Sequence, residues 1–401
     1  MAEAIPVLMY HSVSPKNRSW VSRHLSLDPV IFEDHLRTLV DAGYTTICLS
    51  ELYDYVAGRR HLPAKSIALT FDDGYLDNWV YVHPMLRKYG FRATVFVSTD
   101  FIDRRGHVRP TLEDVWSRRC VREALPSGGF LSAPEMRAMI ESETVDVQAH
   151  CKTHTWHFTT KEIIDFHHPG DFYPWLAWNA RPERKSLYME EDQSEFVPFG
   201  SPVYTHDHSL VAHRYFPDTE IASHLVKWVA SNGGREFFTR PQWRDLLGGE
   251  AERIGPGAGG RHEGDCERFA RLREEIADSK RDLEQVIGKR VDFLCWPGGS
   301  CDVDSIAIAR EAGYKAWTLA GPGPVNKANL PGEDPAWIRR VPAIPWWDYR
   351  GHRVSAVDGK FVRLIIEKYR GAPGAALKLK AYKANRLLRS YLKRAVGRMM
   401  L

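Results

Sequence analysis

Two adjacent carboxylates and two closely spaced histidines are the residues of this sequence best suited to chemistry. Asp72 and Asp73 follow the apolar run 67–71 and precede a glycine, and His150 and His154 come further along, four residues apart. One aspartate with two histidines is a common open ligand set for a catalytic divalent metal, because it leaves coordination positions for water and substrate. The second aspartate is then free to act as a base.

The hydrophobic pattern places both pairs after strands. The runs 66–71 and 145–149 have the length and composition of buried strands, and Gly74 permits a sharp turn after the first. Enzymes with α/β folds build their active sites at the carboxyl ends of such strands. Taken alone, Asp-Asp-Gly is typical of a surface turn and the histidine pair of a solvated helix face. Their order after strands favours a shared site.

Strand-like and helix-like segments alternate along most of the chain. Asp28 is a good N-cap for a helix that ends near Gly43, and Ser50 and Ser132 are expected to cap two further helices. Strands are expected at 5–10, 45–49, 93–97, 292–296, 314–319 and 338–341, and helices at 81–89, 134–141, 267–287 and 306–312. This alternation predicts parallel βα units in a barrel or an open sheet.

Residues 156 to about 265 interrupt the alternation with clusters of proline, glycine, aromatic residues and histidine. The glycine-rich stretch 255–260 has the composition of a flexible linker. We therefore expect three parts: a catalytic barrel of 1–155 and 285–350, an inserted cap or substrate region of 156–284, and a basic amphipathic helical tail of 351–401.

Composition and cysteine usage are those of an ordinary globular protein. The chain has 401 residues, of which 43% are hydrophobic and 26% charged, so it can bury a substantial core. The apolar run 5–10 follows no basic segment and is too short for a signal peptide or a spanning helix, which leads us to expect a cytoplasmic protein. Six cysteines without a CxxC pair are expected to be reduced and not to hold a structural zinc.

Basic charge is concentrated at the C-terminus. Residues 360–401 hold twelve Lys/Arg and one acidic residue, a net charge of about +11, whereas the whole chain carries +4. A uniformly basic nucleic-acid-binding protein is therefore not expected. Apolar residues recur at three- and four-residue steps in this tail, which predicts a basic amphipathic helix. Such a helix would lie on the anionic inner face of a membrane or dock on an acidic partner. The alternative is a solvated or disordered tail.

The two motifs together resemble those of a known superfamily. Thr70-Phe-Asp-Asp-Gly74 and His150-Cys-Lys-Thr-His154 are similar to the first and second motifs of the polysaccharide deacetylases, the NodB-homology group of carbohydrate esterase family 4. The resemblance implies a distorted (β/α) barrel of the α/β class. It also implies that Asp72 is the catalytic base and that Asp73, His150 and His154 bind a divalent metal. Zinc suits this set best, with cobalt, nickel and iron as alternatives.

The third motif departs from the family pattern. Cys295-Trp-Pro-Gly-Gly299 lies where the family normally has an arginine that steadies the base, and this arginine is absent. Arg339 or Arg340 on a neighbouring strand is the candidate replacement. The residues expected to contact substrate are Trp296, Pro297, Trp317 and Arg340. For the two tryptophans, stacking on a sugar ring and packing in the core are equally good expectations.

The N-terminal run Val7-Leu-Met-Tyr-His11 is similar to the start of the exopolysaccharide-modifying branch, in which the histidine-bearing strand lies at the N-terminus. The resemblance makes His11 the general acid, although a hydrogen-bonded histidine at a strand end is the plainer alternative. In amide hydrolysis the metal would polarise the carbonyl and activate water. Asp72 would take the proton of that water, and His11 would protonate the leaving amine and stabilise the oxyanion.

The function expected from these residues is metal-dependent removal of N-acetyl groups from an acetamido sugar in a glycan or a lipid-linked glycan precursor. The same site would also serve an amidohydrolase or an O-deacetylase that acts on another acyl group. A non-catalytic glycan-binding protein is the third possibility, and four intact polar site residues argue against it.

Overall fold

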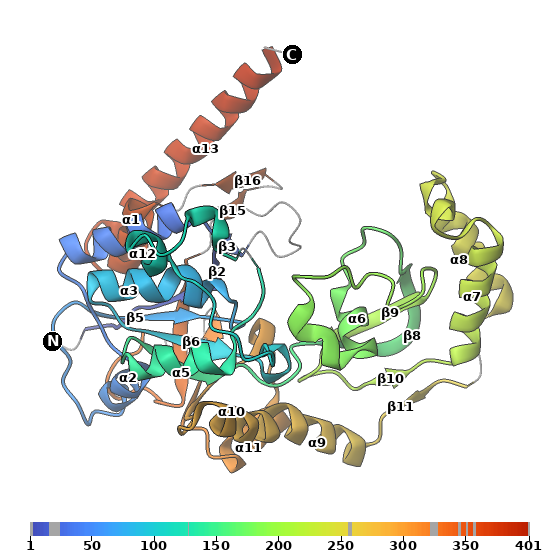
Figure 1. Ribbon diagram of the computed structural model, residues 1–401, viewed down its shortest axis with the longest axis horizontal. Coiled ribbons are helices and arrows are strands. Elements are labelled where there is room, and N and C mark those ends of the chain that lie inside the picture. The colour runs from blue at the N-terminus through green and yellow to red at the C-terminus, as the bar shows by residue number, and fades with distance from the viewer. Residues whose placement is uncertain are drawn as a thin grey trace.

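The computed structural model describes residues 3–15, 25–126, 128–255, 259–320, 328–343, 346–349, 352–355 and 358–399. Its main body is a parallel β-barrel surrounded by helices, and a second lobe stands beside it (Figure 1). The barrel strands are β1 (Val7–Tyr10), β5 (Ser66–Phe71), β6 (Ala93–Val97), β7 (Val145–Ala149), β12 (Phe293–Cys295), β13 (Ala316–Ala320) and β14 (Trp337–Pro342).

The N-terminal strand closes the barrel. The strand order is β1-β14-β13-β12-β7-β6-β5, and β1 also pairs with β5, so the ring has no free edge within it. The short strand β4 (Thr45–Thr46) extends the sheet from β5 outside the ring. The (β/α) barrel expected from the sequence is confirmed, and strand β1 lies between strands that are distant from each other along the chain.

Alternate strand residues face two different cores. Leu8 and Leu69 belong to the main cluster between strands and helices, whereas Val7 and Ala68 belong to a second cluster inside the ring. This is the side-chain period of two that a strand imposes. Helix α2 (Leu49–Val56) contributes its buried face to the inner cluster, because Leu49, Leu52 and Tyr55 belong to it.

The outer layer of the barrel is helical. It contains α1 (Pro29–Asp41), α3 (His83–Tyr89), α5 (Ala133–Glu141), α10 (Ser279–Ile287), α11 (Val303–Glu311) and α12 (Gly359–Tyr369). Asp28 caps α1 by accepting from the amide of Val30, and Ser132 caps α5, both as expected. The expectation for Ser50 is wrong: α2 begins one residue before it, and Cys48 occupies the cap position.

The second lobe is the insertion. Strands β8 (Trp156–Phe166) and β9 (Pro202–His208) form an antiparallel pair, against which α6 (Pro174–Ala180) packs through aromatic residues. Helices α7 (Thr219–Ser231) and α8 (Trp243–Ile254) form its outer end (Figure 1). The chain returns through α9 (Asp265–Arg273), which continues into α10, and Leu272 and Leu283 lie in the main barrel core. The insertion therefore ends near residue 264 and not at 284.

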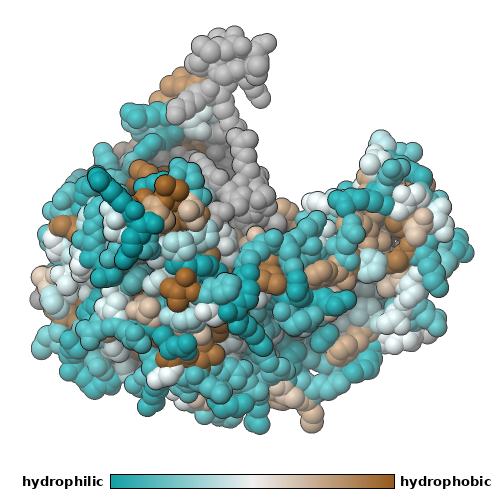
Figure 2. All heavy atoms as spheres, in the orientation of Figure 1, coloured by the Kyte–Doolittle hydropathy of each residue, from teal (hydrophilic) through white to brown (hydrophobic). Residues whose placement is uncertain are grey.

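The C-terminal region has two unlike helices. Helix α12 buries Phe361, Val362 and Ile366 in the barrel core and packs on α1, so it is part of the body. Helix α13 (Ala375–Met399) begins on the body, where Ala375 is buried, and then projects away from it (Figure 1). The expected tail of 351–401 thus starts too early. Among the described residues, none of the helices is both long and apolar enough to cross a membrane. In the view of Figure 2 the described surface is mostly hydrophilic, with separate apolar patches.

Candidate active site

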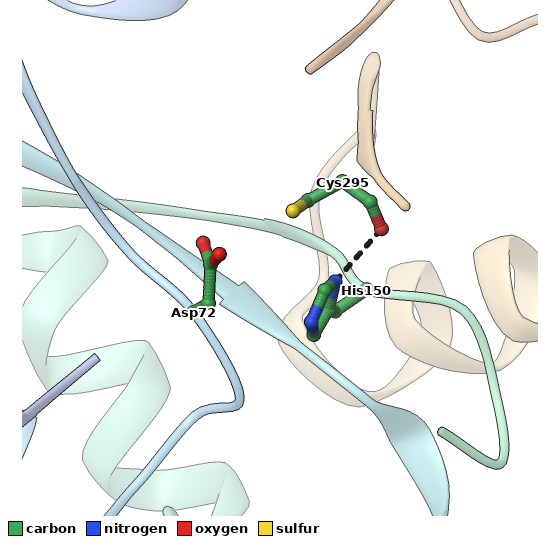
Figure 3. A group of neighbouring side chains, drawn as sticks. All are labelled: Asp72, His150 and Cys295. Carbon is green, nitrogen blue, oxygen red and sulfur yellow. Dashed lines mark hydrogen bonds between the residues drawn. The ribbon is translucent and has the colours of Figure 1, made fainter. Parts of the chain in front are cut away.

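The strand periodicity brings the polar site residues to one end of the barrel interior. Asp72 follows Ala68 and Thr70 at steps of two, and His150 follows Gln148 in the same way. Arg340 is two residues after Ile338, which belongs to the inner cluster. Figure 3 shows Asp72, His150 and Cys295 gathered from three strands. One ligand atom from each of these three lies within 4.8 Å of the others.

Asp72 forms a buried bidentate ion pair with Arg340. The two guanidinium nitrogens donate to the two carboxylate oxygens at 2.6 and 2.9 Å, and each residue is only 3% exposed. Burial alone would raise the pKa of Asp72, but the positive charge of Arg340 and its hydrogen bonds to the carboxylate outweigh it and lower that pKa. Asp72 is therefore held as a carboxylate.

Arg340 takes the place of the arginine that the third motif lacks. The structure selects Arg340 and not Arg339, because the guanidinium of Arg339 lies over the ring of Tyr369. The Sγ of Cys295, in that third motif, accepts a further hydrogen bond from Arg340 at 3.0 Å. The expected substrate contact of Arg340 is not supported, since its buried guanidinium is engaged by Asp72 and Cys295.

His11 lies beside Asp72 because of strand register. Tyr10 on β1 pairs with Phe71 on β5, so the next residues along the two strands are neighbours. The His11 Nε2 atom is 3.8 Å from Asp72 Oδ2, and its side chain is 16% exposed. The structure thus brings the expected acid and base together at the carboxyl ends of the barrel strands, a region we call the barrel mouth. There the His11 side chain is more exposed than that of Asp72.

A buried carboxylate that sequence analysis missed holds the backbone next to His11. Asp77 accepts hydrogen bonds from the Ser12 hydroxyl at 2.5 Å and the Val13 amide at 3.0 Å. Asn78 donates to the carbonyl oxygen of His11 at 3.1 Å. Burial raises the pKa of Asp77 to about 6 against these hydrogen bonds. The sequence offered one signal for these residues: two further polar side chains, Asp77 and Asn78, follow Asp73 closely.

Asp73, His150 and His154 form a possible metal-ligand group. The Asp73 Oδ1 atom is 3.1 Å from His150 Nε2 and 3.3 Å from His154 Nε2. Ligand atoms bound at about 2.1 Å to a tetrahedral metal would lie roughly 3.4 Å from one another, so the spacing fits such an ion. Burial opposes ionisation of Asp73, but hydrogen bonds from both histidines hold its pKa well below its usual range. The group therefore favours a positive charge between its members.

A hydrogen bond orients the ring of His150, and two of the ligands lie on backbone with positive φ angles. Nδ1 of His150 donates to the carbonyl oxygen of Cys295 at 2.7 Å (Figure 3), which leaves Nε2 facing Asp73. Asp73 and His154 have positive φ angles of 73° and 46°. The two histidines thus meet through a strained turn and not across one turn of a helix, and such strain is common at functional sites.

Comparison with known proteins agrees with this geometry. The profile of the polysaccharide deacetylase family matches residues 59–184 and 264–317, which include Asp72, Asp73, His150 and His154. This chain contains a polysaccharide deacetylase domain. The gap in the match corresponds to the outer part of the insertion.

The sequence and structural relatives of this deacetylase domain are partial or distant. The Bacillus subtilis (strain 168) protein YxkH, which is named as a polysaccharide deacetylase, is 36% identical over 104 residues. This match covers 26% of this chain and 35% of YxkH. A de-N-acetylase from Aggregatibacter actinomycetemcomitans has a TM-score of 0.50 at 18% identity, covering 84% of this chain and 94% of that one. The BpsB deacetylase domain from Bordetella bronchiseptica has the same TM-score at 19% identity, covering 84% and 95%. These two structures show the fold.

Three residues of the deacetylase domain that were expected to contact sugar lie in the core. Trp296 and Trp317 are each 1% exposed, their ring centroids are 6.2 Å apart, and Pro297 is buried beside them. A sugar ring needs an open aromatic face to stack on, and neither ring offers one. The core-packing alternative is therefore favoured for both tryptophans, and a substrate contact for Pro297 is not supported.

Aromatic residues that sequence analysis did not assign border the metal-ligand group instead. A cavity of about 430 Å³ is lined by Asp73 and His154 together with residues of the barrel and the insertion. These residues include Tyr75, Phe101, Phe130, Trp156, Trp175 and Trp178. The available signal was the density of aromatic residues between 156 and 188, which sequence analysis recorded only as composition.

Proposed function

We propose that this protein is a metal-dependent hydrolase that removes the N-acetyl group from an acetamido sugar of a glycan or glycan precursor. The observation that carries the proposal is the Asp72–Arg340 ion pair next to the Asp73–His150–His154 group at the barrel mouth. The matched deacetylase domain supports it. Hydrolysis of other acyl groups and non-catalytic binding are the alternatives that the experiment below separates.

The residues divide the work of amide hydrolysis. A divalent metal held by Asp73, His150 and His154 would supply Lewis acidity to the amide carbonyl and to water. Asp72, kept ionised by Arg340, accepts a proton from the attacking water as that oxygen bonds to the carbonyl carbon.

His11 completes the reaction at the leaving group. Its Nε2 donates a proton to the amide nitrogen, the C–N bond breaks, and the products are acetate and the free amine. The His11 side chain is more exposed than that of Asp72, so it can reach the nitrogen of a leaving sugar. Before that step the same Nε2–H can donate to the carbonyl oxygen as negative charge develops there. For the metal itself, one carboxylate and two imidazoles suit zinc best, with cobalt, nickel and iron as alternatives.

The test combines metal content with acetate release from a panel of N-acetylated glycans. We expect stoichiometric metal in the wild type and in Asp72→Asn, loss of metal in His150→Ala, and acetate released only by the wild type. Exposed residues give matched controls: Asp54→Asn and His224→Ala should retain both properties. Bound metal without acetate from any glycan would redirect the assignment to another acyl group. A wild-type protein that binds no metal would reject the proposal in favour of glycan binding alone.

The projecting helix α13 suggests how a lipid-linked substrate would be reached. Its exposed apolar residues Leu388, Tyr391 and Leu392 alternate with Lys and Arg, a pattern suited to an anionic membrane surface at the inner face. Flotation with anionic liposomes should be lost in Leu388→Gln/Leu392→Gln. A truncation at Gly359 would also remove the buried helix α12 and would not be a clean test. Equal flotation of wild type and variant would remove this role.

A further inference from the structure

The cavity beside the metal-ligand group is far larger than an acetyl methyl requires. Its volume is about 430 Å³, within the range of roughly 300–1,000 Å³ typical of small-molecule sites. A methyl group occupies about as much space as one water molecule, roughly 30 Å³. Because Asp73 and His154 form part of its lining, an occupant of this cavity would lie next to the reacting amide.

The cavity wall is a continuous series of packed rings. Phe130 packs against Tyr75 and Phe101 with centroid distances of 5.5 and 4.8 Å. Trp178 lies edge-on to Phe101 at 5.1 Å and to Tyr188 at 5.1 Å. These rings come from both the barrel and the insertion, so the wall exists only because the two lobes meet here.

Several polar groups of the lining are used within the protein, whereas the buried indole N–H of Trp178 has no partner among the described residues. The Tyr75 hydroxyl bonds to Asp73, and the Ser98 hydroxyl donates to the carbonyl oxygen of His150. The Tyr173 hydroxyl donates to Asp165 at 3.3 Å. The hydroxyl groups of a sugar ring would lose water in this cavity, and a wall made mostly of packed rings replaces only part of the lost hydrogen bonds, which is unfavourable. An apolar chain has no hydrogen bonds to water to lose, and its burial is favourable.

From this lining we propose that the cavity accommodates the acyl chain of the amide, and that the enzyme therefore hydrolyses N-acyl sugars with chains longer than acetyl. The inference rests on the proposed amide hydrolysis and specifies its substrate class. The chemistry is unchanged: the water oxygen bonds to the acyl carbon, the C–N bond breaks, and the nitrogen gains a proton. The products are a medium-chain carboxylate and an amino sugar.

Glucosamine with N-acetyl, N-butanoyl, N-hexanoyl or N-octanoyl groups gives the direct test. Each probe is titrated into metal-free protein by calorimetry and then assayed for free amine with metal present. Burial of one methylene corresponds to about fourfold in affinity. We therefore expect affinity and kcat/KM to rise by about two- to fourfold per methylene until the cavity is filled.

An exposed aromatic residue at the rim provides a variant that should fold. Phe172 lines the cavity and is 66% exposed, so Phe172→Asp places a charge in the path of the chain without disturbing the core. We expect this variant to lower the ratio of octanoyl to acetyl hydrolysis about tenfold. Phe269→Asp is the matched control, because Phe269 is 42% exposed on α9 and does not line the cavity; its ratio should stay at the wild-type value.

The outcomes distinguish this inference from the proposed function. Acetate release with no gain from longer chains would overturn the inference and leave N-deacetylation intact. Affinity that grows with the number of sugar residues, and not with chain length, would show that sugar rings occupy the cavity and would also overturn it. If no probe is hydrolysed, the proposed function fails. The binding series in metal-free protein then still decides whether the cavity takes acyl chains.

Discussion

The barrel mouth and the aromatic cavity are adjacent, yet they are built in opposite ways. At the barrel mouth, charged groups are paired across strands that are distant in sequence, as in the bidentate contact of Asp72 with Arg340. In the cavity, rings such as Phe130 and Trp178 pack against other rings. Asp73 and His154 border both. This contrast indicates that separate parts of one active site can serve reaction and selectivity.

The largest expected effect separates these two roles. Asp72→Asn removes the base while leaving the cavity intact, so hydrolysis of every acyl probe should fall by the same factor, roughly 10²–10⁴. Binding of the probes to metal-free protein should be nearly unchanged. The measurement is kcat/KM across the acyl series together with calorimetry. A factor that varies strongly with chain length would mean that Asp72 also shapes the cavity.

The next prediction concerns the buried ion pair. Arg340→Met leaves the carboxylate of Asp72 buried without its partner, which should cost about 3–5 kcal/mol in the free energy of unfolding. Arg340 lowers the pKa of Asp72 in the wild type, so that pKa should rise in the variant. Since the base acts only when ionised, the acidic limb of the pH–rate profile should move to higher pH.

Chemical denaturation and a pH–rate profile check both parts of this prediction. Arg339→Met, one residue away, is the control, because the Arg339 guanidinium lies over Tyr369 and not beside Asp72. An acidic limb that stays in place in Arg340→Met, with full stability, would show that the ion pair does not maintain the base.

Asp77 gives a stability prediction at the boundary of the barrel site. Its pKa in the folded state is about 6, above the value of roughly 3.9 expected in an unfolded chain. The folded protein therefore binds this proton more tightly, and the contribution of Asp77 to stability is full below pH 4 and lost as pH rises to 6. The loss is about 2–3 kcal/mol.

Asp77→Asn removes this titration. Relative to wild type, the variant should gain about 2–3 kcal/mol in unfolding free energy between pH 4 and pH 7, as measured by urea denaturation at both values. The Val13 amide can still donate to the oxygen of the new side chain, and the Ser12 hydroxyl can rotate to accept from its NH2 group. A difference between variant and wild type that does not change with pH would mean that Asp77 is ionised over the whole range.

Sequence patterns predicted the barrel mouth better than the cavity for physical reasons. The motifs place Asp72, Asp73 and His150 directly after strands, and strand periodicity then determines which way they face. The same reasoning left Arg339 and Arg340 as equal candidates, because only the register of β14 decides which one faces inward. His11 was found because a resemblance placed its strand in the barrel, which the pairing of β1 with β5 bears out.

The errors in sequence analysis share a cause. For Trp296 and Trp317 the sequence left a sugar site and the core as equal expectations, because composition does not show which side chains at a strand end are covered by helices; both are buried. The end of the insertion was placed too late, although the apolar face of 265–287 packs on the barrel. The cavity wall was missed because it depends on how the insertion packs against the barrel, as Trp178 of α6 does against Phe101. No local pattern encodes that contact.

The smallest expected effect tests whether a substitution at the cavity rim leaves the stability of the fold unchanged. Phe172 is 66% exposed, so Phe172→Asp should change the free energy of unfolding by no more than about 0.5 kcal/mol. Trp178→Ala, in contrast, removes a ring that is 9% exposed and packs between Phe101 and Tyr188, and should cost about 3–5 kcal/mol. Denaturation of both variants at one pH makes the comparison. If Phe172→Asp were as destabilising as Trp178→Ala, its effect on acyl selectivity would reflect a loosened wall and not a charge at the entrance.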